Sequence, residues 1–119
     1  MHTHGFNEHI GYEVVTLNEE TCILNFEIKD HHRNIYGYVH GGVYFSLSDI
    51  ACGLFVRQDK GNWVTLNGNI NYLKSAKDQP LIVETKLINK SRKLAVLEVT
   101  IRDESTTFAQ SNFTMYLID

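Results

Sequence analysis

The sequence predicts an α+β fold in which a six-stranded antiparallel sheet wraps around one long central helix. One segment that begins near residue 42 is apolar around most of a helical circumference. Six segments rich in β-branched and aromatic residues flank it, two before and four after. A helix of this kind must be enclosed on most sides, and the flanking strands can enclose it if their sheet curves around it.

The chain before the helix supplies the first two strands. Residues 6–10 predict a short helical lead-in, and residues 12–18 and 21–29 predict a hairpin with its turn at residues 18–20. Residues 30–39 have no regular period and contain Asn, Gly and two adjacent histidines. We expect them to form a loop long enough to carry function.

The central helix is predicted from Gly42 to about Gln58. Its main apolar face repeats at intervals of three to four residues and comprises Val43, Leu47, Ile50 and Leu54. Three more apolar side chains widen this face, namely Phe45, Ala51 and Phe55. The sequence therefore indicates a helix that is buried on more than one side.

Four further strands are predicted at 63–73, 80–90, 93–103 and 106–118. The short polar turns between them favour an antiparallel meander over parallel crossovers.

Strict alternation in the first of these four strands predicts one apolar face, made by Val64, Leu66, Ile70 and Tyr72. It predicts a polar face made by Thr65, Asn67, Asn69 and Asn71. A polar outer face and an exposed edge strand favour pairing with a second copy of the chain.

The composition is that of one domain spanning residues 1–119, with 43% hydrophobic and 21% charged residues. The net charge of −3, with acids and bases interspersed, argues against nucleic acid as a partner. The N-terminus does not resemble a signal peptide and no apolar run has membrane-spanning length, so we expect no membrane association and a cytoplasmic location. Cys22 and Cys52 are expected to be free thiols that pack as small apolar residues.

Two glycines stand at the predicted helix start. The first turn of a helix leaves backbone N–H groups unpaired at the positive end of the dipole, so His40, Gly41 and Gly42 form a potential site for an anion or a carbonyl oxygen. The alternative is that the glycines only permit a tight entry into the helix or relieve crowding against the sheet.

Asp49 lies on a stripe of small helix residues with Gly42, Ser46 and Gly53. Small neighbours leave room for a substrate beside the carboxylate, which makes Asp49 a candidate general base or nucleophile. The alternative is a solvent-facing aspartate where the sheet does not cover the helix.

The spacing of these residues bears on assembly. Gly41 and Asp49 are about 12 Å apart along one helix at 1.5 Å per residue, so one substrate carbonyl cannot touch both. If both act on one bond, they come from different subunits, which a two-fold dimer with antiparallel helices provides twice. The sequence thus predicts composite sites at a dimer interface, and the dimers are expected to pair further.

The stretch NIYGYVHGGVYFSLSDIA (34–51) and the following NINYLKSA (69–76) resemble the acyl-CoA thioesterases of the hotdog fold, in particular their PaaI-like branch. The resemblance covers most of the chain in element order. It implies that Asp49 activates water or attacks the thioester and that the Gly41 N–H holds the carbonyl oxygen. It further implies that Asn34 positions water or substrate, and that His40 and Gly42 shape the site.

Many relatives carry a proline after the basic residue that ends the third strand, whereas Lys74 is here followed by Ser75. Contacts of this loop with coenzyme A are therefore open. The basic residues that could meet its phosphates are Lys74, Lys77, Lys90, Arg92 and Lys93, although exposed turns often carry such charges. The aromatic residues that could line the acyl pocket are Tyr36, Tyr38, Phe45 and Tyr72, with packing in the core as the alternative.

The expected function is hydrolysis of an aromatic or medium-chain acyl-CoA, with coenzyme A as part of the substrate and no separate cofactor. No metal site is expected, because His31 and His32 are adjacent and have no supporting Cys or acid cluster. The alternatives are a non-catalytic module that binds acyl-CoA and a purely structural dimer.

Overall fold

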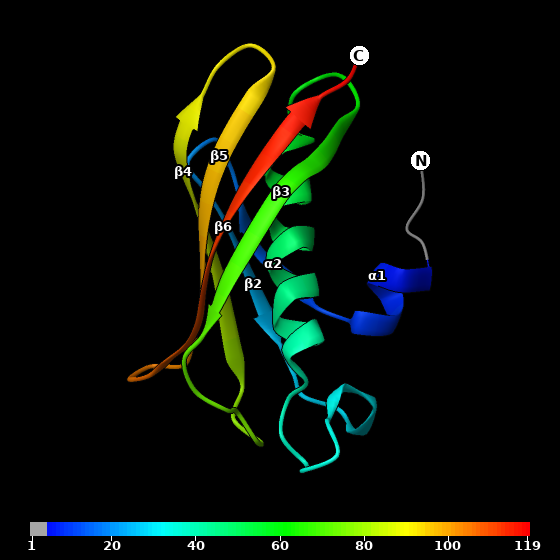
Figure 1. Ribbon diagram of the computed structural model, residues 1–119, viewed down its shortest axis with the longest axis vertical. Helices are drawn as coiled ribbons and strands as arrows, with labels where there is room; N and C mark the ends of the chain where they lie inside the picture. The colour runs from blue at the N-terminus through cyan, green and yellow to red at the C-terminus, as the bar shows by residue number, and fades with distance from the viewer. Residues whose placement is uncertain (1–4) are drawn as a thin grey trace.

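The computed structural model describes residues 5–119 and has the predicted architecture (Figure 1). Helix α2 (Gly41–Val56) lies along the concave face of a six-stranded antiparallel sheet, and the short helix α1 (Gly5–Ile10) packs beside α2. A single 3-10 turn, η1 (Asp30–His32), lies in the long loop that leads into α2. The hotdog arrangement expected from the sequence is therefore confirmed.

The sheet has the order β1-β2-β4-β5-β6-β3. Its strands are β1 (Glu13–Leu17), β2 (Thr21–Phe26), β3 (Trp63–Tyr72), β4 (Leu81–Lys90), β5 (Leu94–Arg102) and β6 (Thr107–Leu117). The predicted four-strand meander is correct for β4 to β6 and wrong for β3, which pairs with β6 at the edge of the sheet, whereas β4 pairs with β2. Because α2 runs between β2 and β3 in the sequence, it separates these strands across the concave face.

The sheet buries α2 on most sides. Ten of the sixteen helix residues are buried, and their side chains meet inward residues of β2 to β6 in one continuous core. Cys22 and Cys52 are free and fully buried in this core, as expected. Removal from water raises the pKa of the Cys22 thiol to about 11 and shifts that of Cys52 in the same direction. Both thiols therefore act as small apolar groups.

A β-bulge at Leu66 corrects the predicted faces of β3. Thr65 pairs with Met115 of β6, whereas Asn67 pairs with Thr114, so Leu66 is left without a partner. The extra residue reverses the alternation, and Thr65 lies on the inner face with Gly68, Ile70 and Tyr72, opposite inward residues of β6. The expectation that Thr65 belongs to the polar outer face is therefore wrong. The extra residue in the bulge interrupts the strict alternation of inward and outward side chains on which that expectation depended.

Gly68 of β3 makes room for the ring of Phe113. A Cβ built at Gly68 would stand 2.5 Å from Phe113 Cε2. Phe113 is fully buried and packs against Phe45 of α2 at a ring-centroid distance of 5.1 Å. The glycine thus allows an aromatic pair to fill the space between the helix and the edge of the sheet.

We predict that Gly68→Ala lowers the free energy of unfolding by about 1–3 kcal/mol, because the enclosed Phe113 ring has no free space to enter. Urea denaturation measures this change. Gly5→Ala is the matched control, since no heavy atom lies within 4 Å of a Cβ at Gly5. Equal stability of the two variants would contradict the packing role of Gly68.

Candidate active site

His40 caps the N-terminus of α2. Its backbone is extended, and its Nδ1 accepts a hydrogen bond of 2.8 Å from the Gly42 N–H. The Val43 N–H donates to the His40 carbonyl oxygen. No described residue accepts a hydrogen bond from the Gly41 N–H. The first turn therefore presents one open donor, at the glycine to which the sequence assigns an oxyanion role.

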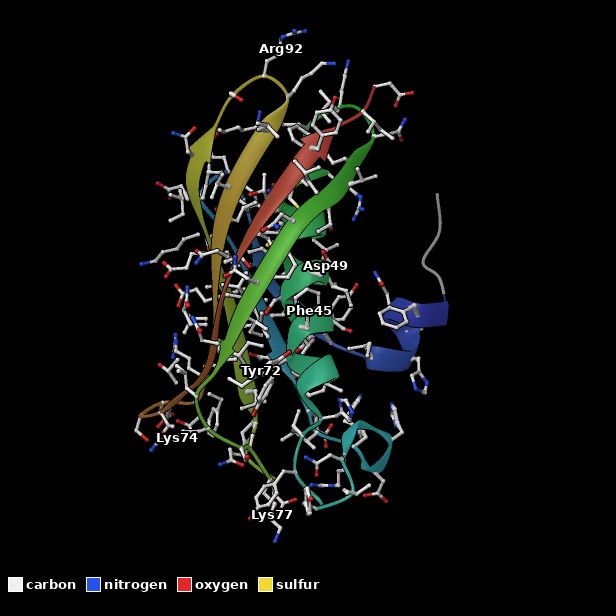
Figure 2. The ribbon with its side chains drawn as sticks, viewed as in Figure 1. Phe45, Asp49, Tyr72, Lys74, Lys77 and Arg92 are labelled. Carbon is white, nitrogen blue, oxygen red and sulfur yellow. The ribbon has the colours of Figure 1, made fainter. Side chains whose placement is uncertain are left out.

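Tyr72, at the end of β3, lies over Gly41. A Cβ built at Gly41 would be 3.2 Å from Tyr72 Cε1 and 3.4 Å from Cζ. Both interpretations of this glycine therefore have support, since it relieves crowding against the sheet and its N–H has no acceptor among the described residues. Figure 2 shows Tyr72 at the level where α2 begins, with Phe45 and Asp49 further along the helix.

Asp49 is half-buried in the middle of α2 and accepts a hydrogen bond through Oδ1 from the hydroxyl of Thr65 on β3. No described residue donates to the second carboxylate oxygen, Oδ2. The carboxylate is thus held in one orientation and has one oxygen left for water or substrate. Sequence reasoning did not identify Thr65, because the bulge that brings it to the inner face has no evident sequence signal.

The remaining predicted helix residues lie on the same stripe as Asp49. Ser46 is half-buried, and Gly42 is exposed at the first turn. Gly53 is buried, and the Arg57 guanidinium covers the position where its Cβ would stand. The stripe of small residues is therefore at least partly exposed to solvent from Gly42 to Asp49, and it is buried one turn later at Gly53.

Asn34 shapes the loop before α2. Its Oδ1 accepts hydrogen bonds from the backbone N–H groups of Tyr36 and Tyr38, at 2.9 and 3.1 Å. The loop is further closed by Arg33, whose Nη1 donates to the Gly37 carbonyl oxygen. The amide oxygen of Asn34 thus forms a turn, while no described residue accepts from its Nδ2. Only this donor end is available for a water or a substrate.

His32 connects this loop to the N-terminal segment. It is 2% exposed, its Nδ1 accepts from the Lys29 N–H at 2.8 Å, and its Nε2 lies 2.6 Å from the Ile10 carbonyl oxygen. This set of partners requires a neutral ring that donates through Nε2. The His32 carbonyl oxygen also accepts from the His40 N–H, so the same residue supports the helix cap. Both ring nitrogens are occupied and unavailable to a metal.

The basic residues form two separate groups within one chain. Lys74 and Lys77 lie at the end of the sheet where α2 begins, whereas Arg92 lies at the opposite end (Figure 2). Lys90 is engaged by an ion pair with Asp59 at 2.9 Å and lies over the ring of Trp63. A ligand bound at Gly41 would meet only the first group from the same chain.

One cavity in the described residues does not include Gly41 or Asp49. It has a volume of about 840 Å³ and lies between α1, the end of β2, η1, the start of β4 with the loop before it, and the loop at 103–105. The open N–H and the carboxylate instead lie along the side of α2 next to the edge strand β3. One chain by itself therefore provides two separate parts of a site, both outside this cavity.

The chain is similar in sequence to known thioesterases. Residues 36–109 match the Thioesterase superfamily model. A Saccharolobus solfataricus protein named as a candidate esterase is 35% identical over 96 residues, a match that covers 79% of this chain and 64% of that protein's length.

Solved structures agree with this assignment. A Streptococcus mutans protein bound to acetyl CoA is 31% identical with a TM-score of 0.85, covering 90% of this chain and 88% of that one. A hypothetical thioesterase of Streptococcus pneumoniae, solved with coenzyme A, is 30% identical with a TM-score of 0.85, covering 90% and 85%. The PaaI protein of Escherichia coli, at 18% identity and a TM-score of 0.88 over 94% and 83%, shares the fold.

The chain therefore belongs to the thioesterase superfamily. Variants of the Streptococcus pneumoniae protein with one aspartate or one threonine replaced by alanine have also been solved. Those two residues are 16 positions apart, the same separation as between Asp49 and Thr65 here. None of the helices within residues 5–119 combines the length and apolar character needed to cross a bilayer.

We predict that His32 makes folding stability depend on pH. Burial lowers the pKa of His32 below its ordinary value of 6.5, an effect that the bond to the Ile10 carbonyl oxygen partly offsets. Below pH 6.5 the unfolded chain takes up a proton that the folded chain does not, so the free energy of unfolding falls as the pH decreases towards the folded pKa. Urea denaturation between pH 5 and 8 measures this slope.

The His32→Leu variant should be less stable at pH 8 and should lose part of the slope. His31→Gln is the control, because His31 is exposed and its ring is tilted against that of His32. This variant should keep the part of the slope that comes from the burial of His32. An unchanged slope in His32→Leu would assign the pH dependence to other groups.

Proposed function

We propose that this protein hydrolyses the thioester of an acyl-CoA, and that each active site contains Gly41 of one subunit and Asp49 of another. The observation that carries the proposal is a pair of groups on one side of α2 that lack a hydrogen-bond partner within residues 5–119. They are the Gly41 N–H and the second oxygen of the Thr65-bound carboxylate. The family match and the relatives solved with coenzyme A or acetyl CoA support the reaction and the substrate class.

The exposed edge of the sheet supports a two-fold dimer. Strand β3 is ten residues long, ends the sheet and exposes Val64, Leu66 and Tyr72 to solvent. A long, apolar edge of this kind favours pairing with another copy. If Gly41 of one antiparallel helix faces Asp49 of the other, the two-fold axis passes next to the residue halfway between them in each helix. That residue is Phe45, which is half-buried at this edge. Two-fold symmetry would then bring the two Phe45 rings together.

The chemistry follows from the charge that develops on the thioester. As the carbonyl carbon becomes tetrahedral, its oxygen gains negative charge, which the Gly41 N–H and the positive end of α2 stabilise. Asp49 either removes a proton from the attacking water or attacks the carbonyl itself, with Thr65 fixing its orientation. The C–S bond then breaks, and coenzyme A leaves as a thiolate that needs no strong acid. In the second case the acyl group remains on Asp49 as an anhydride, and water hydrolyses it to the acid and the free carboxylate.

The acyl group we propose is aromatic or of medium length, bound against aromatic residues at the subunit interface. Tyr36 and Tyr38 are exposed on the loop before α2, and Phe45 and Tyr72 lie along the open side of the helix. Lys74 and Lys77, at the same end as Gly41, would contact the phosphates. We place the protein in the cytoplasm as a dimer that can pair further, with coenzyme A as part of the acyl-CoA substrate and no separate cofactor.

We predict that Asp49→Asn reduces kcat for acyl-CoA hydrolysis by at least about 10²-fold, because the amide can neither accept the proton of water nor attack the thioester. A thiol-release assay with acetyl-, hexanoyl-, decanoyl- and phenylacetyl-CoA measures the loss and the acyl preference. Thr65→Val should lower kcat less, since the carboxylate remains but loses its partner. A wild-type protein that binds acyl-CoA and releases no thiol would instead identify a binding module.

A second prediction tests the shared site. Gly41→Pro removes the N–H at a helix position that tolerates proline and should lower kcat, whereas Gly41→Ala retains the N–H and is the control for the contact with Tyr72. Co-expressed Asp49→Asn and Gly41→Pro subunits should regain part of the activity, because one of the two sites in each heterodimer has neither substitution. Inactive heterodimers of confirmed composition would place both residues in the same subunit's site.

A further inference from the structure

Tyr72 packs against Gly41, the residue that carries the open donor at the start of α2. Its ring edge, Cε1 to Cζ, lies over Gly41, with Cζ 3.4 Å from the position that a Gly41 Cβ would take. The hydroxyl is attached to that same Cζ. The phenol group and the Gly41 N–H therefore belong to one small region of one subunit.

The hydroxyl of Tyr72 has no partner among the described residues, and the side chain is 54% exposed. The neighbouring Tyr44 shows the contrast. It stacks with Tyr72 at a ring-centroid distance of 6.3 Å, but its hydroxyl accepts from the Ala76 N–H at 3.0 Å and donates to the Lys74 carbonyl oxygen. Tyr44 is therefore fixed in the fold by its hydroxyl, whereas Tyr72 is held by its ring and leaves its hydroxyl free.

Within the part of the chain that the structure describes, the first turn of α2 offers one backbone donor to an oxyanion. A second donor from the next residue would be the usual solution, but the Gly42 N–H is bonded to His40 Nδ1 and the Val43 N–H to the His40 carbonyl oxygen. A tetrahedral oxyanion has lone pairs for more than one donor, and each donor in a water-excluded site contributes strongly to the rate. A second donor from the protein at this helix start would therefore be a side chain.

We propose that Tyr72 is a catalytic residue whose hydroxyl donates the second hydrogen bond to the thioester oxyanion, beside the Gly41 N–H of the same subunit. This inference rests on the proposed thioesterase function. The hydroxyl keeps its proton throughout, because Asp49 of the other subunit handles the proton of water. One subunit thus supplies both oxyanion donors, and the other supplies the carboxylate with its Thr65 support.

The decisive experiment is Tyr72→Phe, which removes the hydroxyl and keeps the ring over Gly41. We expect kcat for hexanoyl-CoA to fall about 10²-fold, with KM changed less than threefold, because the lost bond strengthens only as charge develops. A trifluoromethyl ketone analogue of hexanoyl-CoA, which forms a tetrahedral adduct, should bind more weakly by a similar factor, while coenzyme A itself binds as before.

Tyr116→Phe is the matched control, since Tyr116 lies on β6 opposite Val64, away from Gly41, and should retain wild-type kcat. If Tyr72 only forms a wall of the pocket, Tyr72→Phe will keep full kcat and Tyr72→Ala will raise KM, which overturns the proposal. A wild-type enzyme that fails to release thiol would overturn the thioesterase function itself, so the two failures are distinguishable.

Discussion

The burial of α2 is the constraint on which the rest of this structure depends. A helix that is apolar around most of its circumference cannot face water, and the sheet curves to cover it. The cover is incomplete along the side next to β3, where Phe45, Ser46 and Asp49 are only half-buried. A carboxylate can be kept there because it is partly solvated and bonded to Thr65, whereas a buried unpaired one would be costly. The candidate site lies where the core leaves α2 uncovered.

The two chemical parts of the site depend on different features of the same helix. The donor part is set by the helix start, where His40 satisfies Gly42 and leaves Gly41 open. The carboxylate part lies two turns later, where the hydroxyl of Thr65 on β3 donates a hydrogen bond to Asp49. Since a rigid helix keeps these parts about 12 Å apart, cooperation between them requires a second subunit. The catalytic proposal and the dimer proposal are thus one geometric argument.

Hydrogen bonds in the loop before α2 stabilise the conformation of the helix start from outside the site itself. His32 binds the N-terminal segment through its ring and the cap residue His40 through its carbonyl oxygen. Asn34 uses its amide oxygen to form the turn that follows. These bonds hold the approach to the helix start in one conformation. A precisely placed N–H is useful to catalysis because its orientation costs no reorganisation during the reaction.

Periodicity along the chain was enough to predict the helix, the six strands and the hairpin at residues 18–20, whose Asn18 caps the turn with two hydrogen bonds. These features depend on local patterns of apolar residues and turn formers. The place of β3 in the sheet could not be predicted in the same way. The strand order depends on where the chain enters the sheet again after α2 has crossed the concave face. That position is not a local property of the sequence.

The sequence by itself determined that one apolar helix would carry a glycine pair at its start and a carboxylate two turns later, because helix spacing follows from residue number alone. Only the tertiary structure decided what these groups meet. The bulge at Leu66 turns Thr65 inward to Asp49, and the edge position of β3 lays Tyr72 over Gly41. Both contacts join residues far apart in the chain, and a single extra residue in a strand reverses which side chains face the helix.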